Sequence, residues 1–144
     1  MKKILLPLFT VLLLGVVLNC SSVPAKDPFL QRQWMLVSFD GFSKDQLIAN
    51  KAEFNLTANK VKGKIQASSY MGCNRMSFMT EFKTGGNVKI SKGASTMKAC
   101  QDMNLEMSFQ KKIETMTHYS IDGHFLTLSD DHGNSMKFVA ADWD

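Results

Sequence analysis

Three cysteines, Cys20, Cys73 and Cys100, are the side chains with the widest chemistry in this sequence of 144 residues. A thiolate can act as a nucleophile or a metal ligand, and two thiols in an oxidising compartment can form a disulfide. A catalytic cysteine needs a nearby base, and no histidine lies close in sequence to Cys73 or Cys100. A structural disulfide, a free or redox-active pair and a nucleophile are therefore the interpretations to weigh.

The remaining titratable side chains do not form a recognisable catalytic or metal-binding motif. His118, His124 and His132 are scattered, without the paired spacing of a zinc site, and there is no G-x-S-x-G or phosphate-binding loop. Asp130 and Asp131 are adjacent, so they diverge on an extended chain and make poor acid–base partners. We therefore predict a turn at residues 130–134 and expect no enzyme activity, no catalytic residue, no metal site and no cofactor.

Methionine is the one residue type whose abundance suggests a metal. The sequence has ten, and several lie close together. Thioethers and thiolates suit Cu(I), so a copper site is one interpretation. Flexible filling of a hydrophobic core is the commoner use of methionine. The methionines that lie close together in the sequence form two groups, one of Met71, Met76 and Met79 and one of Met97, Met103 and Met107.

Alternation of apolar and polar residues predicts seven or eight antiparallel strands. Within 75–91, the side chains of Met76, Phe78, Thr80 and Phe82 share one face before a Gly85-Gly86 turn. Residues 52–68 predict a hairpin that turns at Asn59-Lys60, with Val61, Gly63 and Ile65 on one face and lysines on a wet face. Further strands are predicted in 118–129 and 135–140, and in 33–41, where both faces are mainly apolar and a buried strand is expected.

One segment has helical spacing instead. Leu105, Phe109, Ile113 and Met116 follow one another at i, i+4, i+8 and i+11, which places them on one helical face. Met103 and Met107 would widen this face, and Ser95 or Thr96 would cap the start of the helix. We expect this helix to be inserted before the last strands of an α+β domain.

The N-terminus resembles a bacterial lipoprotein signal. Lys2 and Lys3 precede an uncharged apolar run over 4–18, and Cys20 follows shortly after. The resemblance implies a signal peptide over 1–19, a lipidated Cys20, a tether over 20–31 and a domain over 32–144. An ordinary secretory signal, cleaved near Ser22-Val23-Pro24-Ala25, is the alternative.

Removal of residues 1–19 takes away Lys2 and Lys3 and no acid, so the formal charge falls from +4 to +2. No cluster of basic and aromatic residues remains, so nucleic acid is not an expected partner. With Cys20 lipidated, Cys73 and Cys100 can pair only with each other, and we favour that disulfide, worth about 3.5 kcal/mol in the chain-entropy estimate. Gly72 and Asn74 beside Cys73 tolerate positive φ at a tight bend.

Four motifs, in this order, resemble the META domain of HslJ-like bacterial lipoproteins over residues 32–140. They are "QWMLVSFDG", "SSYMGCNRMSF", "STMKACQDMNLEMSFQKKI" and "LTLSDDHGNSMKFV". The most specific parts are Gly72-Cys73-Asn74, Thr96 to Cys100, and Glu106. The resemblance implies a mostly antiparallel, barrel-like sheet of about seven or eight strands with one inserted helix. It implies no established catalysis, and an association with envelope stress. For Glu106 we expect a structural role, in which it pairs with a lysine or with backbone amides.

These features predict a non-enzymatic, outer-membrane-anchored protein that faces the periplasm, with exposure at the cell surface as an alternative. The resemblance to a lipoprotein signal also implies outer-membrane sorting in a Gram-negative cell, because serine rather than aspartate follows Cys20. The partners expected are the membrane, through the lipid, and an envelope protein. The alternative function is a periplasmic module that binds a small ligand or copper. The oligomeric state is left open.

Overall fold

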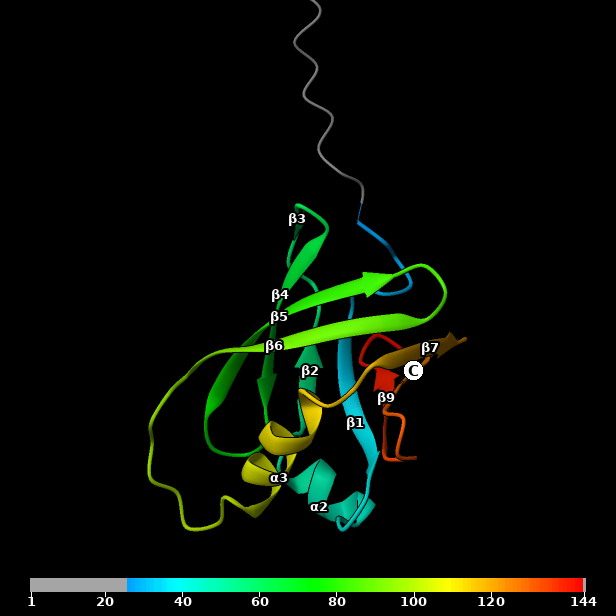
Figure 1. The fold of residues 1–144 in the computed structure, drawn as a ribbon. Helices are drawn as coiled ribbons and strands as arrows, with labels where there is room; N and C mark the ends of the chain where they lie inside the picture. Colours follow the sequence, from blue (N-terminus) through cyan, green and yellow to red (C-terminus); the bar gives the residue numbers. More distant parts are fainter. Residues whose placement is uncertain (1–25, 144) are drawn as a thin grey trace, which may run out of the picture.

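The computed structural model describes residues 26–143, which contain nine strands and two helices (Figure 1). The signal peptide predicted over 1–19, and Cys20 with it, lie outside the described residues. The elements are β1 Gln33–Phe39, α2 Lys44–Ala49, β2 Glu53–Asn55, β3 Lys60–Val61, β4 Lys64–Tyr70, β5 Arg75–Lys83, β6 Asn87–Ser95, α3 Asn104–Ile113, β7 His118–Asp122, β8 Phe125–Ser129 and β9 Ser135–Ala140.

The strands form one antiparallel sheet in the order β2-β1-β9-β8-β7-β6-β5-β4-β3. A further pairing of β2 with β4, with Glu53 opposite Tyr70, closes eight of the strands into a barrel and leaves β3 outside it. Among the strands of the barrel, β6 and β7 share the shortest pairing, in which Asn87 and His118 form one aligned pair. The predicted α+β fold with a mostly antiparallel, barrel-like sheet is confirmed.

Aromatic side chains fill the interior of the barrel. The rings of Phe54, Phe78, Phe109 and Phe138 are fully buried, as is Trp34. The Phe109 ring comes from α3 and lies 6.4 Å from the Phe54 ring and 6.2 Å from the Phe78 ring, measured between centroids. Eight-stranded barrels are just wide enough for side chains to fill them. The helix α3 therefore closes one end of the barrel by contributing to its core.

The helix α3 confirms the predicted apolar face but not the predicted start. Leu105, Phe109, Ile113 and Met116 are all buried, whereas Met107 is exposed to solvent. The helix begins at Asn104, after an N-cap at Met103 that makes no side-chain hydrogen bond. The prediction of a cap at Ser95 or Thr96 was wrong because Thr96 and Lys98 bond to residues at the start of β5, as described below, and residues 96–100 form no helix.

The short helix α2 was not predicted, because six residues are too few to show helical periodicity. Its sequence signal is a capping box, in which Ser43 and Gln46 each accept a hydrogen bond from the other's backbone N–H. Of its side chains, Leu47 is the one that is buried.

The hairpin predicted within 52–68 is formed differently from the expectation. The turn lies at Lys62-Gly63, between β3 and β4, and not at Asn59-Lys60. Both turn residues have positive φ, 49° and 80°, as a tight two-residue hairpin turn requires. Ile65 is buried but Val61 is exposed, so the predicted shared face is also wrong.

Residues 27–31 pack against the barrel, so the ordered domain begins before residue 32, inside the segment 20–31 that we expected to be a tether. Leu30 is buried, and its carbonyl accepts a hydrogen bond from the indole N–H of Trp34 at 3.0 Å. The side-chain amide of Gln31 donates to the carbonyl of Ala58 at 2.6 Å.

Candidate functional site

Cys73 and Cys100 form a disulfide, the pairing that the sequence favoured. Their Cα atoms are 6.1 Å apart, and 27 positions separate them in sequence. Cys73 is buried at the turn between β4 and β5, whereas Cys100 is exposed in the segment that precedes α3. The bond therefore ties the central sheet to the approach of α3, and neither sulfur is a free thiolate that could act as a nucleophile or metal ligand.

Asn74, next to Cys73, is a buried hydrogen-bonding centre. Its backbone N–H donates to Glu106 Oε2 at 2.6 Å, and its side-chain Nδ2 donates to Glu106 Oε1 at 2.9 Å. Its Oδ1 accepts from Thr96 Oγ1 and from the backbone N–H of Lys98, both at 2.8 Å. We call Asn74, Thr96, Lys98 and Glu106 the Asn74 network. It joins the start of β5, the segment after β6 and α3.

Glu106 lies in the first turn of α3 and is buried. Both of its carboxylate oxygens face Asn74. A buried carboxylate is tolerated when hydrogen bonds satisfy it, and its position near a helix N-terminus is also favourable. The expectation of a structural role that reaches backbone amides agrees with this contact.

Thr96 links the two sides of this network. Its hydroxyl accepts from the backbone N–H of Arg75 at 3.1 Å while it donates to Asn74, and its own N–H donates to the carbonyl of Arg75 at 3.0 Å. These bonds hold Thr96 against the start of β5, which is why the helix starts later than predicted.

Gly72 supplies the bend before the disulfide. Its φ is 105°, and a Cβ at this position would lie 2.1 Å from Asn50 Oδ1. Both backbone conformation and space therefore require glycine here. Asn74, in contrast, does not adopt the positive φ that we expected, because among the described non-glycine residues only Lys51 and Lys62 do so. Its role lies in its side-chain amide.

The residues of the most specific motifs, Gly72 to Asn74, Thr96 to Cys100 and Glu106, therefore have structural roles. Every polar atom of the Asn74 and Glu106 side chains has a partner inside the network. The outward side of the same segment is open to solvent, and Met97 is 97% exposed. The arrangement therefore holds residues 96–100 in one conformation and presents their outer side.

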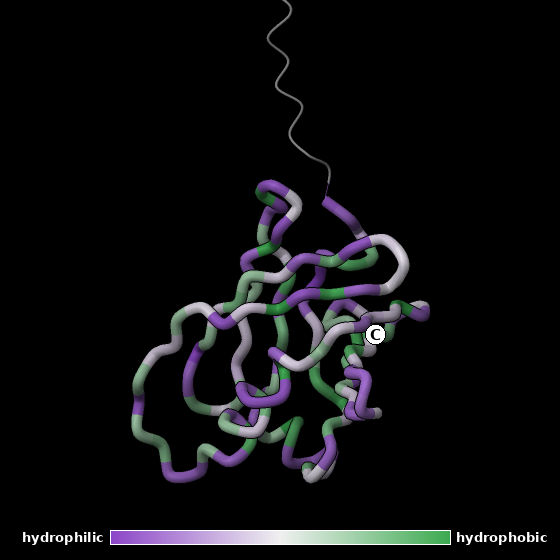
Figure 2. The backbone as a smooth tube through the Cα atoms, in the orientation of Figure 1, coloured by the Kyte–Doolittle hydropathy of each residue, from purple (hydrophilic) through white to green (hydrophobic). Residues whose placement is uncertain are grey.

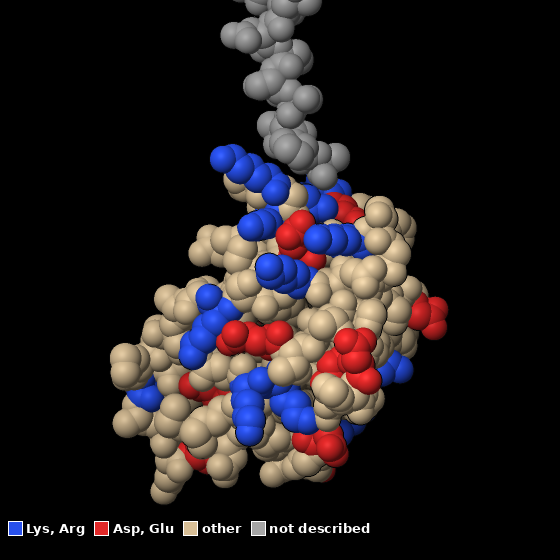
Figure 3. All heavy atoms as spheres, in the orientation of Figure 1, with Lys and Arg blue, Asp and Glu red and all other residues tan. Residues whose placement is uncertain are grey.

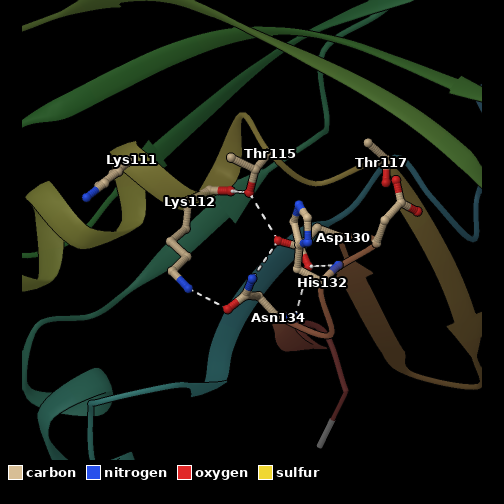
Figure 4. A pocket seen from close by; sticks show the side chains of 8 residues that line it. Lys111, Lys112, Thr115, Thr117, Asp130, His132 and Asn134 are labelled. Atoms are coloured by element: carbon tan, nitrogen blue, oxygen red, sulfur yellow. Dashed lines mark hydrogen bonds between the residues drawn. The ribbon is translucent and has the colours of Figure 1, made fainter.

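A shallow hollow of about 380 Å³ lies between the end of α3 and the turn from β8 to β9 (Figure 4). Asp130 organises this turn, because its Oδ1 accepts from the backbone N–H of His132 and of Asn134, both at 2.9 Å. Lys112 Nζ donates to Asn134 Oδ1 at 2.5 Å. The predicted turn is present, and its polar side chains mainly hold the turn together.

Partial burial disfavours the ionised form of Asp130, but hydrogen bonds from the side chain and backbone of Asn134 and from the backbone of His132 outweigh it. The pKa of Asp130 is therefore held below its ordinary value. The pKa of Asp142 is also lowered, chiefly by its hydrogen bond with Arg32, at 3.0 Å.

The histidines and carboxylates do not converge. His118 Nε2 lies 2.8 Å from Asp131 Oδ1, while the ring of His124 stacks on Trp143 with centroids 4.9 Å apart. Asp130 and Asp131 have different partners, as predicted from their adjacency. Within residues 26–143, no three side chains of His, Cys, Asp or Glu are grouped so that they could hold a metal ion.

The methionines divide between core and surface. Four of them, Met71, Met76, Met116 and Met136, are buried in the hydrophobic core, the common use of this residue. The exposed ones lie on different elements, Met79 on β5, Met97 after β6 and Met107 on α3. The copper hypothesis also lacks its thiolates, because both cysteines of the described residues are in the disulfide.

The sequence analysis missed a second surface feature, a groove beside the β3–β4 hairpin. Val61, Lys62, Lys64 and Met79 line this groove of about 670 Å³, together with Ala58, Asn59 and Gln66. Val61 is 65% exposed. The signal was the run "KVKGK", in which an apolar residue stands between lysines at the tip of a hairpin.

Comparisons with known proteins identify the fold and the family. The META domain family model matches residues 27–143. A protein from Burkholderia xenovorans solved by NMR has 20% identity and a TM-score of 0.56, over 87% of this chain and 97% of that chain. A DUF4847 family protein from Bacteroides vulgatus, solved as a crystal structure, has 12% identity and a TM-score of 0.52, over 81% of this chain and 97% of that chain. A search of curated proteins finds no significant match. Neither helix in residues 26–143 has the length and apolar composition needed to span a bilayer.

Proposed function

Because this chain belongs to the META domain family, with a small β-barrel domain over most of its length, we propose that it is a lipid-anchored binding module of the bacterial envelope. In this proposal Cys20 carries the lipid, the domain faces the periplasm from the outer membrane, and the bound partner is another envelope protein. The biological role would be stress tolerance, as the resemblance to HslJ-like lipoproteins suggests.

The N-terminal sequence supports the anchor. A basic start, an apolar run of fifteen residues over 4–18 and a cysteine at position 20 form the pattern of a lipoprotein signal. Stable anchoring by acyl chains is physically sound, because each buried methylene contributes about 0.8 kcal/mol.

One observation carries the proposal of a binding module. The residues of the specific motifs, Cys73, Asn74, Thr96, Cys100 and Glu106, are joined to one another by a disulfide and buried hydrogen bonds. Aromatic side chains meanwhile fill the barrel. The motif therefore acts to hold a surface segment in place, which favours recognition through the exterior over chemistry in an interior pocket.

Mass spectrometry of the full-length protein, extracted from the membrane of its own cells, tests the anchor. We expect a mature chain that begins at Cys20 and carries acyl groups. Crosslinking in living cells through a photoreactive residue at Met97 tests the binding role, with Lys44 on α2 as the matched exposed control position. We expect one discrete envelope protein to be captured from position 97 alone. An unmodified Cys20, or identical weak capture from both positions, would overturn the corresponding part.

A further inference from the structure

The chain enters the domain beside the β3–β4 hairpin. Lys26 Nζ donates to the carbonyl of Thr57 at 2.7 Å, and Gln31 donates to Ala58, which also lines the groove. Both contacts lie just before β3. The first described residues and the hairpin therefore share one end of the barrel, opposite the end that carries α2 and α3 (Figure 1).

This end of the barrel is basic. Lys60, Lys62 and Lys64 fall within five residues, Lys62 and Lys64 are exposed, and within the described chain none of the three forms an ion pair. Basic side chains gather over the same end in Figure 3. The acids near it have other partners. Glu81 lies 3.8 Å from Lys83, and Asp27 accepts from the backbone N–H groups of Phe29 and Leu30.

Apolar side chains stand among these lysines. Val61 is 65% exposed and Met79 is 43% exposed, and both line the groove beside the hairpin. The backbone of the hairpin alternates between hydrophobic and hydrophilic residues (Figure 2). A surface that combines exposed apolar groups with lysines suits the boundary between lipid headgroups and acyl chains.

We infer that the β3–β4 hairpin end of the barrel lies on an anionic lipid surface. This inference rests on the proposed anchor, because only six positions separate Cys20 from Lys26 and six residues span at most about 20 Å. An acylated Cys20 therefore keeps this end of the domain close to the bilayer. Lys60, Lys62 and Lys64 contact lipid phosphates there, each strengthening the contact about fivefold, while Val61 and Met79 reach the headgroup layer.

The orientation has a consequence for the other end of the molecule. The helix α3 and the segment 96–100, which the disulfide holds, then point away from the membrane that carries the anchor (Figure 1). The segment with the fully exposed Met97 is thus presented to partners in the periplasm.

Fluorescence quenching in proteoliposomes tests the inference. Full-length protein extracted from membranes is reconstituted with phosphatidylethanolamine and brominated phosphatidylglycerol, as Val61→Trp and, separately, as Met79→Trp. The matched control is Met107→Trp, an exposed methionine of α3 at the opposite end. The wild-type signal from Trp34 and Trp143 is subtracted. Circular dichroism verifies that each variant is folded.

We expect quenching at positions 61 and 79 but not at 107. We also expect 0.5 M salt to abolish this quenching. The triple variant Lys60→Gln/Lys62→Gln/Lys64→Gln should abolish it as well. The control variant Lys44→Gln/Lys51→Gln/Lys111→Gln, which removes the same charge elsewhere, should keep it. Equal quenching at 61 and 107, no quenching at 61 and 79, or quenching that ignores the hairpin lysines would each overturn the inference. Mass spectrometry of Cys20 on the same sample reports the anchor separately, so failure of the anchor and failure of the hairpin contact are distinguished.

Discussion

Asn74 donates two hydrogen bonds to the carboxylate of Glu106, one from its backbone N–H at 2.6 Å and one from its side chain at 2.9 Å. The two residues are 32 positions apart, and both are buried. Together with the Cys73–Cys100 disulfide, this pair holds α3 and the segment before it against the start of β5. The stability of that region should therefore depend on a few groups that can be changed singly.

Replacement of Glu106 by Gln should destabilise the domain although the shape is kept. In glutamine an NH₂ group replaces one of the two carboxylate oxygens that accept hydrogen bonds from Asn74. One N–H of Asn74 then loses its acceptor and is left buried and unsatisfied. We expect a loss of about 1–3 kcal/mol in the free energy of unfolding. Urea denaturation measures it, with Glu114→Gln at the exposed C-cap of α3 as the control. Equal stability of the two variants would show that the Asn74 contact contributes nothing.

Removal of the disulfide should have a larger effect. The paired variant Cys73→Ser/Cys100→Ser frees the unfolded chain from a cross-link between positions 27 apart, and we expect a loss of about 2–4 kcal/mol. Denaturation of the wild-type protein with and without reductant provides a second measurement. Alkylation followed by mass spectrometry should add two groups at Cys73 and Cys100 after reduction and none before. Alkylation without reductant would contradict the pairing.

Gly72→Ala should cost more stability than an alanine at another glycine with positive φ. Gly41 and Gly133, with φ of 86°, have nothing within 4 Å of an added Cβ, whereas Gly72 faces Asn50. We expect about 1–3 kcal/mol from backbone strain at each position, with an added cost at Gly72. Introducing Asn50→Ala should remove that added cost. If the Gly72 and Gly41 variants unfold at the same urea concentration, space at Gly72 is not limiting.

The low pKa of Asp130 makes a prediction about acid stability. A carboxyl group whose folded pKa lies below its unfolded value, about 3.9, stabilises the folded state above that value. The stabilisation is lost as pH falls toward the folded pKa. At pH values below about 4, the urea concentration at the midpoint of unfolding should therefore fall in the wild type. In Asp130→Asn this midpoint should fall less steeply with pH. An unchanged slope in the variant would refute this assignment, and Asp142→Asn tests the second lowered carboxyl in the same way.

Local patterns were enough to predict the main elements of the domain. In β5 the alternation of Met76, Phe78 and Thr80 already shows which side is buried, because side chains on a strand alternate between two faces. The spacing of Leu105, Phe109 and Ile113 likewise predicted the buried face of α3. The cysteine count, read with the lipoprotein-like N-terminus, favoured the disulfide. These inferences needed only the geometry of neighbouring residues.

Contacts between residues that are far apart in the sequence could not be predicted from these local patterns. Nothing near Thr96 in sequence indicates that its hydroxyl bonds to Asn74 instead of capping α3, since the two residues meet only when β5 and β6 pair. Val61 is exposed because β3 lies outside the closed barrel. In the strands that form the barrel, the residues of one face point into the interior and are buried. Periodicity along the chain specifies which residues share a face. Whether that face meets the core or solvent depends on the closure of the barrel, which is a property of the whole chain.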